Sequence, residues 1–126
     1  MKTTRDLIDY VRSHLVAQGE RCANERGNCL YKCGTKSCAI GCLIDDDLYR
    51  PEFEGNSVMH CNVEMAISVT HRIALSDEQL RVLRKLQYIH DERDPKHWGT
   101  FIARYVSSLE PSVLDEELMP AKYITV

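Results

Sequence analysis

Residues 29–58, CLYKCGTKSCAIGCLIDDDLYRPEFEGNSV, decide how the rest of this chain must be arranged. Within them, CLYKC and CAI flank the segment GTKS at 34–37, which is typical of a tight connection between two strands. We therefore expect a short β-hairpin over residues 29–40. Because an isolated two-stranded ribbon is only marginally stable in water, the helices predicted elsewhere must cover it.

The hairpin leads into a segment with small side chains. Ala39, Gly41 and Cys42 leave room for another part of the chain to approach closely, and we expect neighbouring helices to press against them. Residues 39–49 are predicted to form a helical turn or a short helix, which the acidic triplet and the proline after it bring to an end. Residues 50–57 then form a loop, in which a Gly-Asn pair favours a turn with positive φ.

Helical patterns account for most of the remaining chain. Residues 4–18 and 77–90 carry apolar side chains at helical spacing, and each segment begins with a capping signal. A further helix starts at Asp94-Pro95 and presents a broad apolar face. Residues 58–74 fit the period of a strand as well as that of a helix, and their length without turn residues favours a helix.

These patterns predict a mainly helical α+β fold, in which about four helices pack around a short β-hairpin. The chain of 126 residues suits a single domain. We expect residues 1–119 to form that domain. Residues 120–126 form a tail whose apolar end can dock or add to the edge of a sheet.

Charge and hydropathy narrow the classes of partner. The chain has 16 basic and 19 acidic residues and a net charge of −3. This charge argues against direct nucleic-acid binding, which depends on neutralising phosphates. No window approaches the length of an apolar membrane span, and the N-terminal residues lack the apolar run of a signal peptide, so we expect no membrane partner. The expected location is the cytoplasm, where cysteines stay reduced.

The first candidate site is a zinc centre made by Cys29, Cys33, Cys38 and Cys42, which are spaced C-x3-C-x4-C-x3-C. Structural zinc takes four soft ligands in a tetrahedron, and its common sites use tighter pairs. On one extended strand Cys29 and Cys33 lie more than about 10 Å apart and need a bend to share an ion, whereas Cys29 and Cys38 can face each other across the hairpin. The competing prediction, which we favour, is that the cysteines are small buried side chains and that the protein has no cofactor.

The second candidate site joins the acidic segment after the hairpin to a downstream His-Asp pair. Its carboxylates can bind a divalent cation or a basic protein surface, or form a solvated acidic loop, and their spacing does not match an EF-hand. The His-Asp pair ends a predicted helix and is the nearest candidate to join them. The predicted binding residues are Asp45, Asp46, Asp47, Tyr49, Glu52, Glu54, Asn56, His90 and Asp91.

The third candidate is a cysteine nucleophile. A thiolate is stabilised at a helix N-terminus, where Cys38 or Cys42 can lie, and a downstream histidine would have to act as its base. No local signature marks such a pair. We therefore assign no catalytic residue, and we favour a protein that is not an enzyme while leaving that question open.

The same stretches carry a resemblance to known proteins. The motifs CLYK, CAIGCLI, EGNSV and LQYIHD, followed by a tryptophan, resemble those of a family of small proteins carried by tailed bacteriophages and prophages. The resemblance covers roughly residues 1–110. Cys33 departs from the family pattern, which weakens the prediction of a four-cysteine zinc site. The matching positions are Cys29, Cys38, Gly41, Leu43, Glu54, Gly55, His90 and Asp91.

The resemblance implies a phage accessory protein in the cytoplasm of an infected bacterial host. By analogy with small phage proteins that lack a catalytic motif, we expect it to act by binding, as a host-takeover or counter-defence inhibitor of a host protein. Two alternatives stay open. One is an oligomer that sequesters a small nucleotide-like molecule, and the other is a cysteine- or metal-dependent hydrolase.

Overall fold

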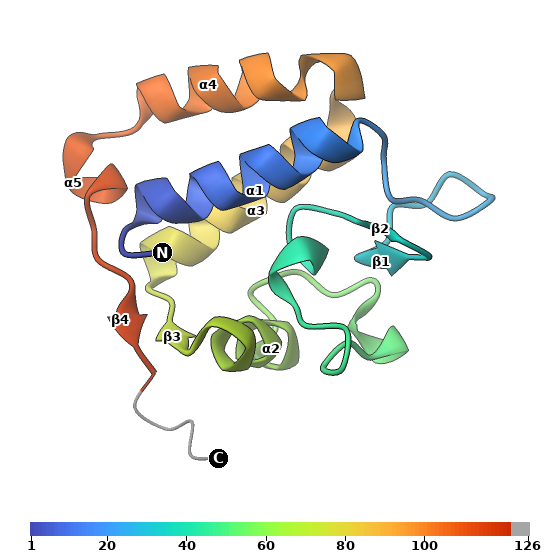
Figure 1. The fold of residues 1–126 in the computed structure, drawn as a ribbon, viewed down its shortest axis with the longest axis horizontal. Coiled ribbons are helices and arrows are strands. Elements are labelled where there is room, and N and C mark those ends of the chain that lie inside the picture. Colours follow the sequence, from blue (N-terminus) through green and yellow to red (C-terminus); the bar gives the residue numbers. More distant parts are fainter. Residues whose placement is uncertain (122–126) are drawn as a thin grey trace.

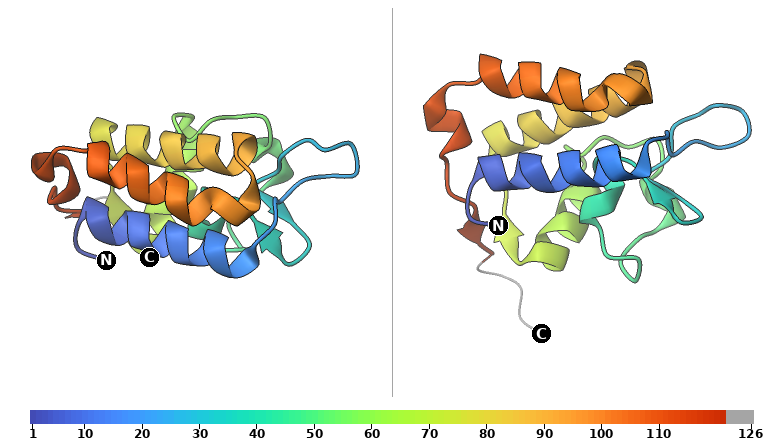
Figure 2. Two further views of the ribbon diagram at one scale, coloured as in Figure 1. Left: turned by 90° about the horizontal axis from the view of Figure 1, so that it is seen from above. Right: turned by 45° about the horizontal axis from the view of Figure 1, so that its top comes forward.

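Three long helices form the frame of the structure, a computed structural model that describes residues 1–121. They are α1 (Thr4–Gln18), α3 (Asp77–Glu92) and α4 (Trp98–Ser108). α1 and α3 lie side by side and run in the same direction, and α4 returns across both of them (Figure 1; Figure 2). The short helix α5 (Pro111–Leu114) follows α4.

Capping side chains explain where two of these helices begin. Thr3 and Ser76 each form a capping box, in which the hydroxyl accepts the backbone N–H of the third helical residue. That residue, Asp6 in α1 and Gln79 in α3, accepts the N–H of the cap in return. α1 ends at Gly19, whose φ of 71° lets the chain leave the helix. The capping signals predicted for both helices are confirmed.

The hydrophobic core lies where the apolar faces of the helices meet. Trp98, at the start of α4, is fully buried and stacks on His90 of α3, and burying a large apolar side chain contributes about 2–3 kcal/mol. α2 (Cys61–His71) packs below this frame through Val63 and Ile67. The helix predicted over 58–74 is thus confirmed for residues 61–71, whereas residues 73–74 form a strand. The buried residues of the three frame helices include Leu7, Ile8, Val11, Leu15, Leu80, Leu83, Leu86, Trp98 and Ile102.

The cysteine-rich stretch forms a very short hairpin beside the end of α1. β1 (Lys32–Cys33) pairs with β2 (Lys36–Ser37) in antiparallel register. Two single turns of 3-10 helix follow, η1 (Gly41–Leu43) and η2 (Pro51–Phe53). A third such turn, η3 (Pro95–His97), leads into α4. Figure 1 shows the hairpin and η1 packed under the helical frame, as a marginal ribbon requires.

Gly41 is small for a reason that differs from the prediction. A Cβ atom on Gly41 would lie 1.9 Å from the carbonyl oxygen of Tyr31, so the backbone of the hairpin, and not a helix, presses against it. The same carbonyl accepts the backbone N–H of Cys38 at 3.0 Å. Tyr31 therefore faces Cys38 across the hairpin, and the predicted pairing of Cys29 with Cys38 is wrong.

The start of α1 is joined to the far end of the described chain. The backbone N–H of Thr4 donates to the carbonyl of Glu116 at 2.9 Å. Gln79 of α3 is buried, and its side-chain amide donates to the Thr4 hydroxyl at 3.2 Å and to the carbonyl of Glu117 at 3.1 Å. One buried amide thus ties together the first helix, the third helix and the segment after α5.

A second small sheet includes the beginning of the predicted tail. β3 (Ile73–Ala74) pairs with β4 (Met119–Pro120), with Pro120 opposite Ile73. Residues 122–126 of the tail lie outside the described residues. The fold is a mainly helical α+β domain, with four main helices and small antiparallel sheets. Among residues 1–121 no helix combines the length and the apolar character that crossing a membrane requires.

Candidate functional site

Three segments that are far apart in the sequence surround a cleft of about 360 Å³. Residues 29–31, before the hairpin, form one wall, and residues 54–58 form another. The third wall is the face of α3 between Arg84 and Asp91. The cleft therefore brings part of the predicted acidic segment next to the predicted His-Asp pair.

Glu54 and Tyr49 hold one wall of the cleft in place. Both carboxylate oxygens of Glu54 accept the backbone N–H of Tyr31, at 2.8 and 3.1 Å. The Tyr49 hydroxyl donates to the same carboxylate at 2.5 Å, and the Tyr31 hydroxyl donates to the carbonyl of Asn56. Two of the predicted binding residues, Glu54 and Tyr49, thus have their polar atoms engaged within the fold.

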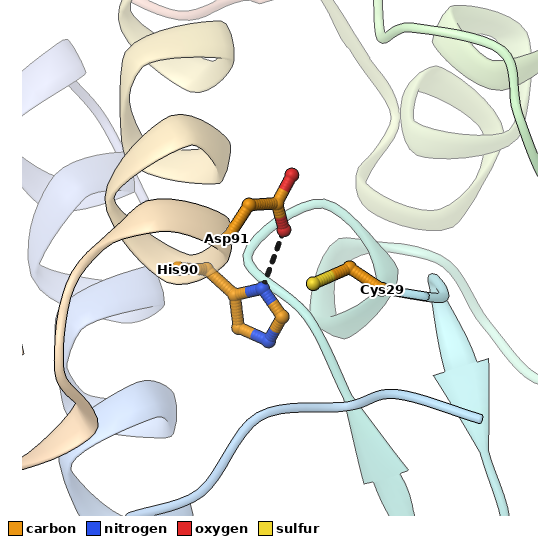
Figure 3. Close-up of side chains that lie close together, drawn as sticks. All are labelled: Cys29, His90 and Asp91. Carbon is orange, nitrogen blue, oxygen red and sulfur yellow. Dashed lines mark hydrogen bonds and ion pairs between the residues drawn. The ribbon is translucent and has the colours of Figure 1, made fainter. Parts of the chain in front are cut away.

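Cys29, His90 and Asp91 come together at the α3 wall of the cleft (Figure 3). One ligand-type atom from each residue lies within 4.8 Å of the other two. Nδ1 of His90 lies 2.8 Å from Oδ1 of Asp91. The His90 side chain is fully buried, and its ring stacks on that of Trp98 with the centroids 5.1 Å apart. This cluster anchors the end of α3 to the loop that precedes the hairpin.

The partners of His90 assign its proton to one ring nitrogen. The backbone N–H of Cys22 donates to Nε2 at 3.1 Å, so this nitrogen presents its lone pair. In the neutral ring the proton then lies on Nδ1, which donates it to Asp91. A metal ion needs a free nitrogen lone pair, and His90 has none left to offer. The three residues therefore do not fit a metal ion.

Cys29 is a thiol and not a thiolate. Removal from water, and next to it the Asp91 carboxylate, raise the pKa of the Cys29 thiol to about 11. A nucleophilic cysteine needs a lowered pKa and a base that can accept its proton. His90 cannot act as that base, since Cys22 occupies one nitrogen and the other already carries a proton. The chemistry of the cluster is to hold Asp91 in place.

Asp91 is the ionised member of the cluster. Burial alone would raise the pKa of this carboxyl, but hydrogen bonds from His90 and Gln87 outweigh it, and the pKa of Asp91 lies below its usual value. Nε2 of Gln87 donates to Oδ1 at 2.8 Å, the same oxygen that faces His90. Figure 3 shows the second carboxylate oxygen pointing away from the His90 ring. The cleft wall thus carries a fixed anionic acceptor.

The residues predicted for the site do not include Arg84, Gln87 or Tyr88, which also line the cleft. Oε1 of Gln87 accepts the backbone N–H of Ile40 at 3.1 Å, so this side chain joins α3 to the turn after the hairpin. The sequence could have indicated all three, because they lie seven, four and three positions before the candidate Asp91 and residues at those spacings share a helix face.

Two residues of the acidic triplet, Asp45 and Asp46, line a second, wider groove of about 900 Å³ between α1 and the segment after η1. Its four carboxylates are those of Asp6, Asp9, Asp45 and Asp46. Asp46 pairs with Lys32 at 2.6 Å, and this contact lowers the pKa of the Asp46 carboxyl. Asp47 and Glu52 are exposed and line neither hollow. The predicted binding residues therefore do not form one site: some line the cleft, two line the groove, and others line neither.

The four cysteines predicted as a zinc site do not come together. Among residues 1–121, the cluster of Figure 3 is the only group of three or more ligand-type side chains whose ligand atoms lie within 4.8 Å of one another. Cys38 is buried and its sulfur accepts the N–H of Gly41 at 3.2 Å. Burial raises the pKa of the Cys42 thiol to about 12, and the Cys33 thiol donates to the carbonyl of Ala23 at 3.6 Å.

This distribution of thiols predicts which cysteine reacts first. Cys61, the exposed cysteine, is expected to react rapidly with a thiol reagent in the native protein, while the buried Cys22 and Cys38 react only on unfolding. Stopped-flow absorbance with an aromatic disulfide reagent at pH 7.5 measures the two phases. Cys61→Ser should abolish the fast phase, and a fast phase that survives this substitution would contradict the burial pattern.

Comparison of the chain with family models, with curated proteins and with solved structures found no match. The resemblance to phage proteins therefore stays a prediction.

Proposed function

We propose that the protein acts by binding, and that the cleft beside Asp91 takes a small nucleotide-like molecule, which the protein sequesters. The observation that carries this proposal is the placement of Asp91, Tyr88 and Arg84 along one wall of the cleft. In that order they offer an anionic acceptor, an aromatic ring and a cation. A ligand site needs a few fixed polar groups of this kind within a largely preformed hollow.

Asp91 supplies the acceptor for the base or the sugar. Its Oδ1 accepts hydrogen bonds from His90 and Gln87. Among residues 1–121, no nitrogen donor bonds to Oδ2. The side chain keeps 33% of its surface exposed. Amino groups of nucleobases and hydroxyls of ribose are donors that a fixed carboxylate oxygen recognises, and hydrogen bonds to a charged acceptor are the stronger kind.

Tyr88 and Arg84 supply the contacts to the base and the phosphate. The Tyr88 side chain is 46% exposed, so its ring is open to stacking. Arg84 is exposed and has no acidic partner within residues 1–121. Arg84 and Asp91 are separated by two helical turns, about 10 Å along the axis, which suits a mononucleotide with its base near one residue and its phosphate near the other.

Sequestration needs no bond-making step, which agrees with a cluster that lacks an activated thiol. The proposed setting is the cytoplasm of an infected bacterial host. There an oligomeric phage accessory protein would lower the concentration of a free nucleotide by binding it. The setting and the assembly rest on the resemblance of the sequence to phage proteins, and the ligand class rests on the cleft.

We expect the purified protein to bind AMP or GMP in isothermal titration calorimetry, and the parent nucleosides more weakly because they lack the group that Arg84 contacts. Tyr88→Ala and Arg84→Gln are each expected to raise the Kd about tenfold, which corresponds to about 1.4 kcal/mol. Both side chains are exposed, so the fold should tolerate either change.

Arg26→Gln is the matched control, because Arg26 is exposed in the loop before the hairpin and lines no part of the cleft. This variant should keep the wild-type Kd. The proposal fails if neither nucleotide binds at millimolar concentration, or if all three variants bind with the affinity of the wild type.

An inhibitor of a host protein is the second candidate, and the acidic groove favours it. Besides its four carboxylates, the groove is lined by Met1 and Tyr10, which are 45% and 44% exposed. Negative charge next to apolar surface complements a basic partner that carries an apolar anchor. Asp9→Asn with Asp45→Asn should abolish capture of that partner from host lysate while Glu110→Gln retains it, and equal capture by all three proteins would exclude the groove.

A further inference from the structure

We infer that the phosphate end of the cleft continues as a track across α3 and α4 that binds a short single-stranded oligonucleotide; the inference rests on the proposed function and narrows its ligand class. The cleft shares Arg84 and Tyr88 with a neighbouring hollow of about 390 Å³. That hollow shares Lys85 with a third one of about 260 Å³, which reaches α4. The three hollows thus form one continuous surface.

Cations line the outer part of this track. They are Arg81, Arg84, Lys85, Arg93 and Arg104. Only one of them, Arg81, has an acidic partner in the part of the chain that the structure describes, namely Glu78 at 3.0 Å. Unpaired cations along a hollow attract a chain of phosphates, because binding releases the counterions that the phosphates hold.

Aromatic rings alternate with the cations along the track. Nζ of Lys85 lies 4.9 Å from the centre of the Tyr88 ring. The guanidinium of Arg93 lies 5.7 Å from that ring and 5.0 Å from the ring of Phe101. On the far side, the guanidinium of Arg104 lies 5.7 Å from the Phe101 ring. Cation and ring therefore alternate from the edge of the cleft onto α4.

The alternation favours an unpaired nucleic-acid strand as the occupant. Exposed cation–π contacts are weak, so an incoming base can replace them, and each base that stacks on a ring gains more than such a contact supplies. A guanidinium plane offers a second surface for stacking. An acidic protein segment would use the cations alone and would leave the exposed ring of Tyr88 and the half-buried ring of Phe101 without a matching flat partner.

The overall charge of −3 does not oppose this inference, because part of the acidic charge lies at a different groove. Four carboxylates line the groove beside α1, and Figure 2 shows α1 and α3 on opposite sides of α4. Closer to the track, Glu78 pairs with Arg81, Glu92 lies at the end of α3, and Glu54 and Asp91 line the cleft from which the track continues. A negative net charge is therefore compatible with a locally basic surface. The prediction that nucleic acid does not bind directly rests on the net charge alone.

Fluorescence anisotropy with a labelled ten-nucleotide oligothymidylate, run beside the AMP titration, tests the track. We expect the oligonucleotide to bind at least tenfold more tightly than the mononucleotide. The double variant Arg93→Gln/Arg104→Gln should raise the Kd for the oligonucleotide about tenfold. It should also lower the slope of log Kd against log salt by about 1.4, because each cation removed lowers that slope by about 0.7. It should leave AMP binding unchanged, because neither residue lines the cleft.

Lys2→Gln/Arg26→Gln removes two exposed cations outside the track and should bind like the wild type. An oligonucleotide no tighter than AMP, or a double variant with wild-type affinity, would overturn the track while AMP binding upholds the cleft. Oligoglutamate that displaces the oligonucleotide at equal charge concentration would also overturn it, in favour of an acidic protein partner. Oligonucleotide binding without any mononucleotide binding would overturn the proposed function and keep the track.

Discussion

Replacing Gly41 with alanine is expected to destabilise the fold by about 3 kcal/mol or more, because the new Cβ atom would lie 1.9 Å from the carbonyl oxygen of Tyr31. A backbone oxygen cannot rotate aside as the end of a side chain can. Moving it would break the bond that it accepts from Cys38 at 3.0 Å and shift the N–H that Glu54 accepts. Urea unfolding followed by circular dichroism measures the loss.

Gly99→Ala is the matched control for this substitution. The Cβ atom added there would meet Cγ2 of Val16 at 3.5 Å, which is ordinary van der Waals contact. Gly99 lies within α4, where alanine is expected to stabilise the protein by about 0.5–1 kcal/mol. A Gly41→Ala protein that unfolds at the urea concentration of the wild type would contradict the close approach of the hairpin.

His90→Ala is the second substitution with a large expected effect, about 4 kcal/mol. It leaves a cavity against Trp98, whose ring stacks on His90. It also leaves the buried N–H of Cys22 without its acceptor and removes one of the donors that fix the Asp91 carboxylate. Thermal unfolding measures the total, and AMP binding should weaken at temperatures where the variant is still folded.

His90→Phe separates packing from hydrogen bonding. Phenylalanine keeps a flat ring against Trp98 and loses only the two hydrogen bonds, so we expect about half of the destabilisation of His90→Ala, about 2 kcal/mol. Zinc should leave the melting temperature of the wild type unchanged. A rise with zinc that disappears in His90→Phe would contradict the assignment of the proton to Nδ1.

Local signals in the sequence predict the helices well. α3 begins at the capping box that Ser76 and Gln79 predict, and α1 begins at Thr3, one of the two threonines that the sequence offers as its cap. Capping and apolar spacing act within a few residues of each other, so they can be read without knowing the tertiary fold. The helical preference for 58–74 holds for residues 61–71, because a run of that length without turn residues has no place to reverse direction, and it fails at residues 73–74, which form a strand.

The cleft is harder to predict because it depends on contacts between distant segments. The sequence shows a carboxylate at Glu54, but it does not show that both oxygens accept the backbone N–H of Tyr31. These hydrogen bonds give Glu54, a predicted binding residue, a structural role. It shows cysteines at regular intervals, but the register that sets Tyr31 opposite Cys38 rests on the tight approach at Gly41. His90 and Asp91 were predicted for the site, and their geometry assigns them different tasks.

The junction between the two ends of the described chain has a consequence for biosynthesis. The contact between Thr4 and the carbonyl of Glu116 spans 112 residues, so α1 leaves the ribosome on the order of ten seconds before its partner is translated. Until then Gln79 also lacks the carbonyl of Glu117. Ribosome-bound chains arrested before residue 116 should therefore be cut readily by protease, and folding should be completed only after the last segment emerges.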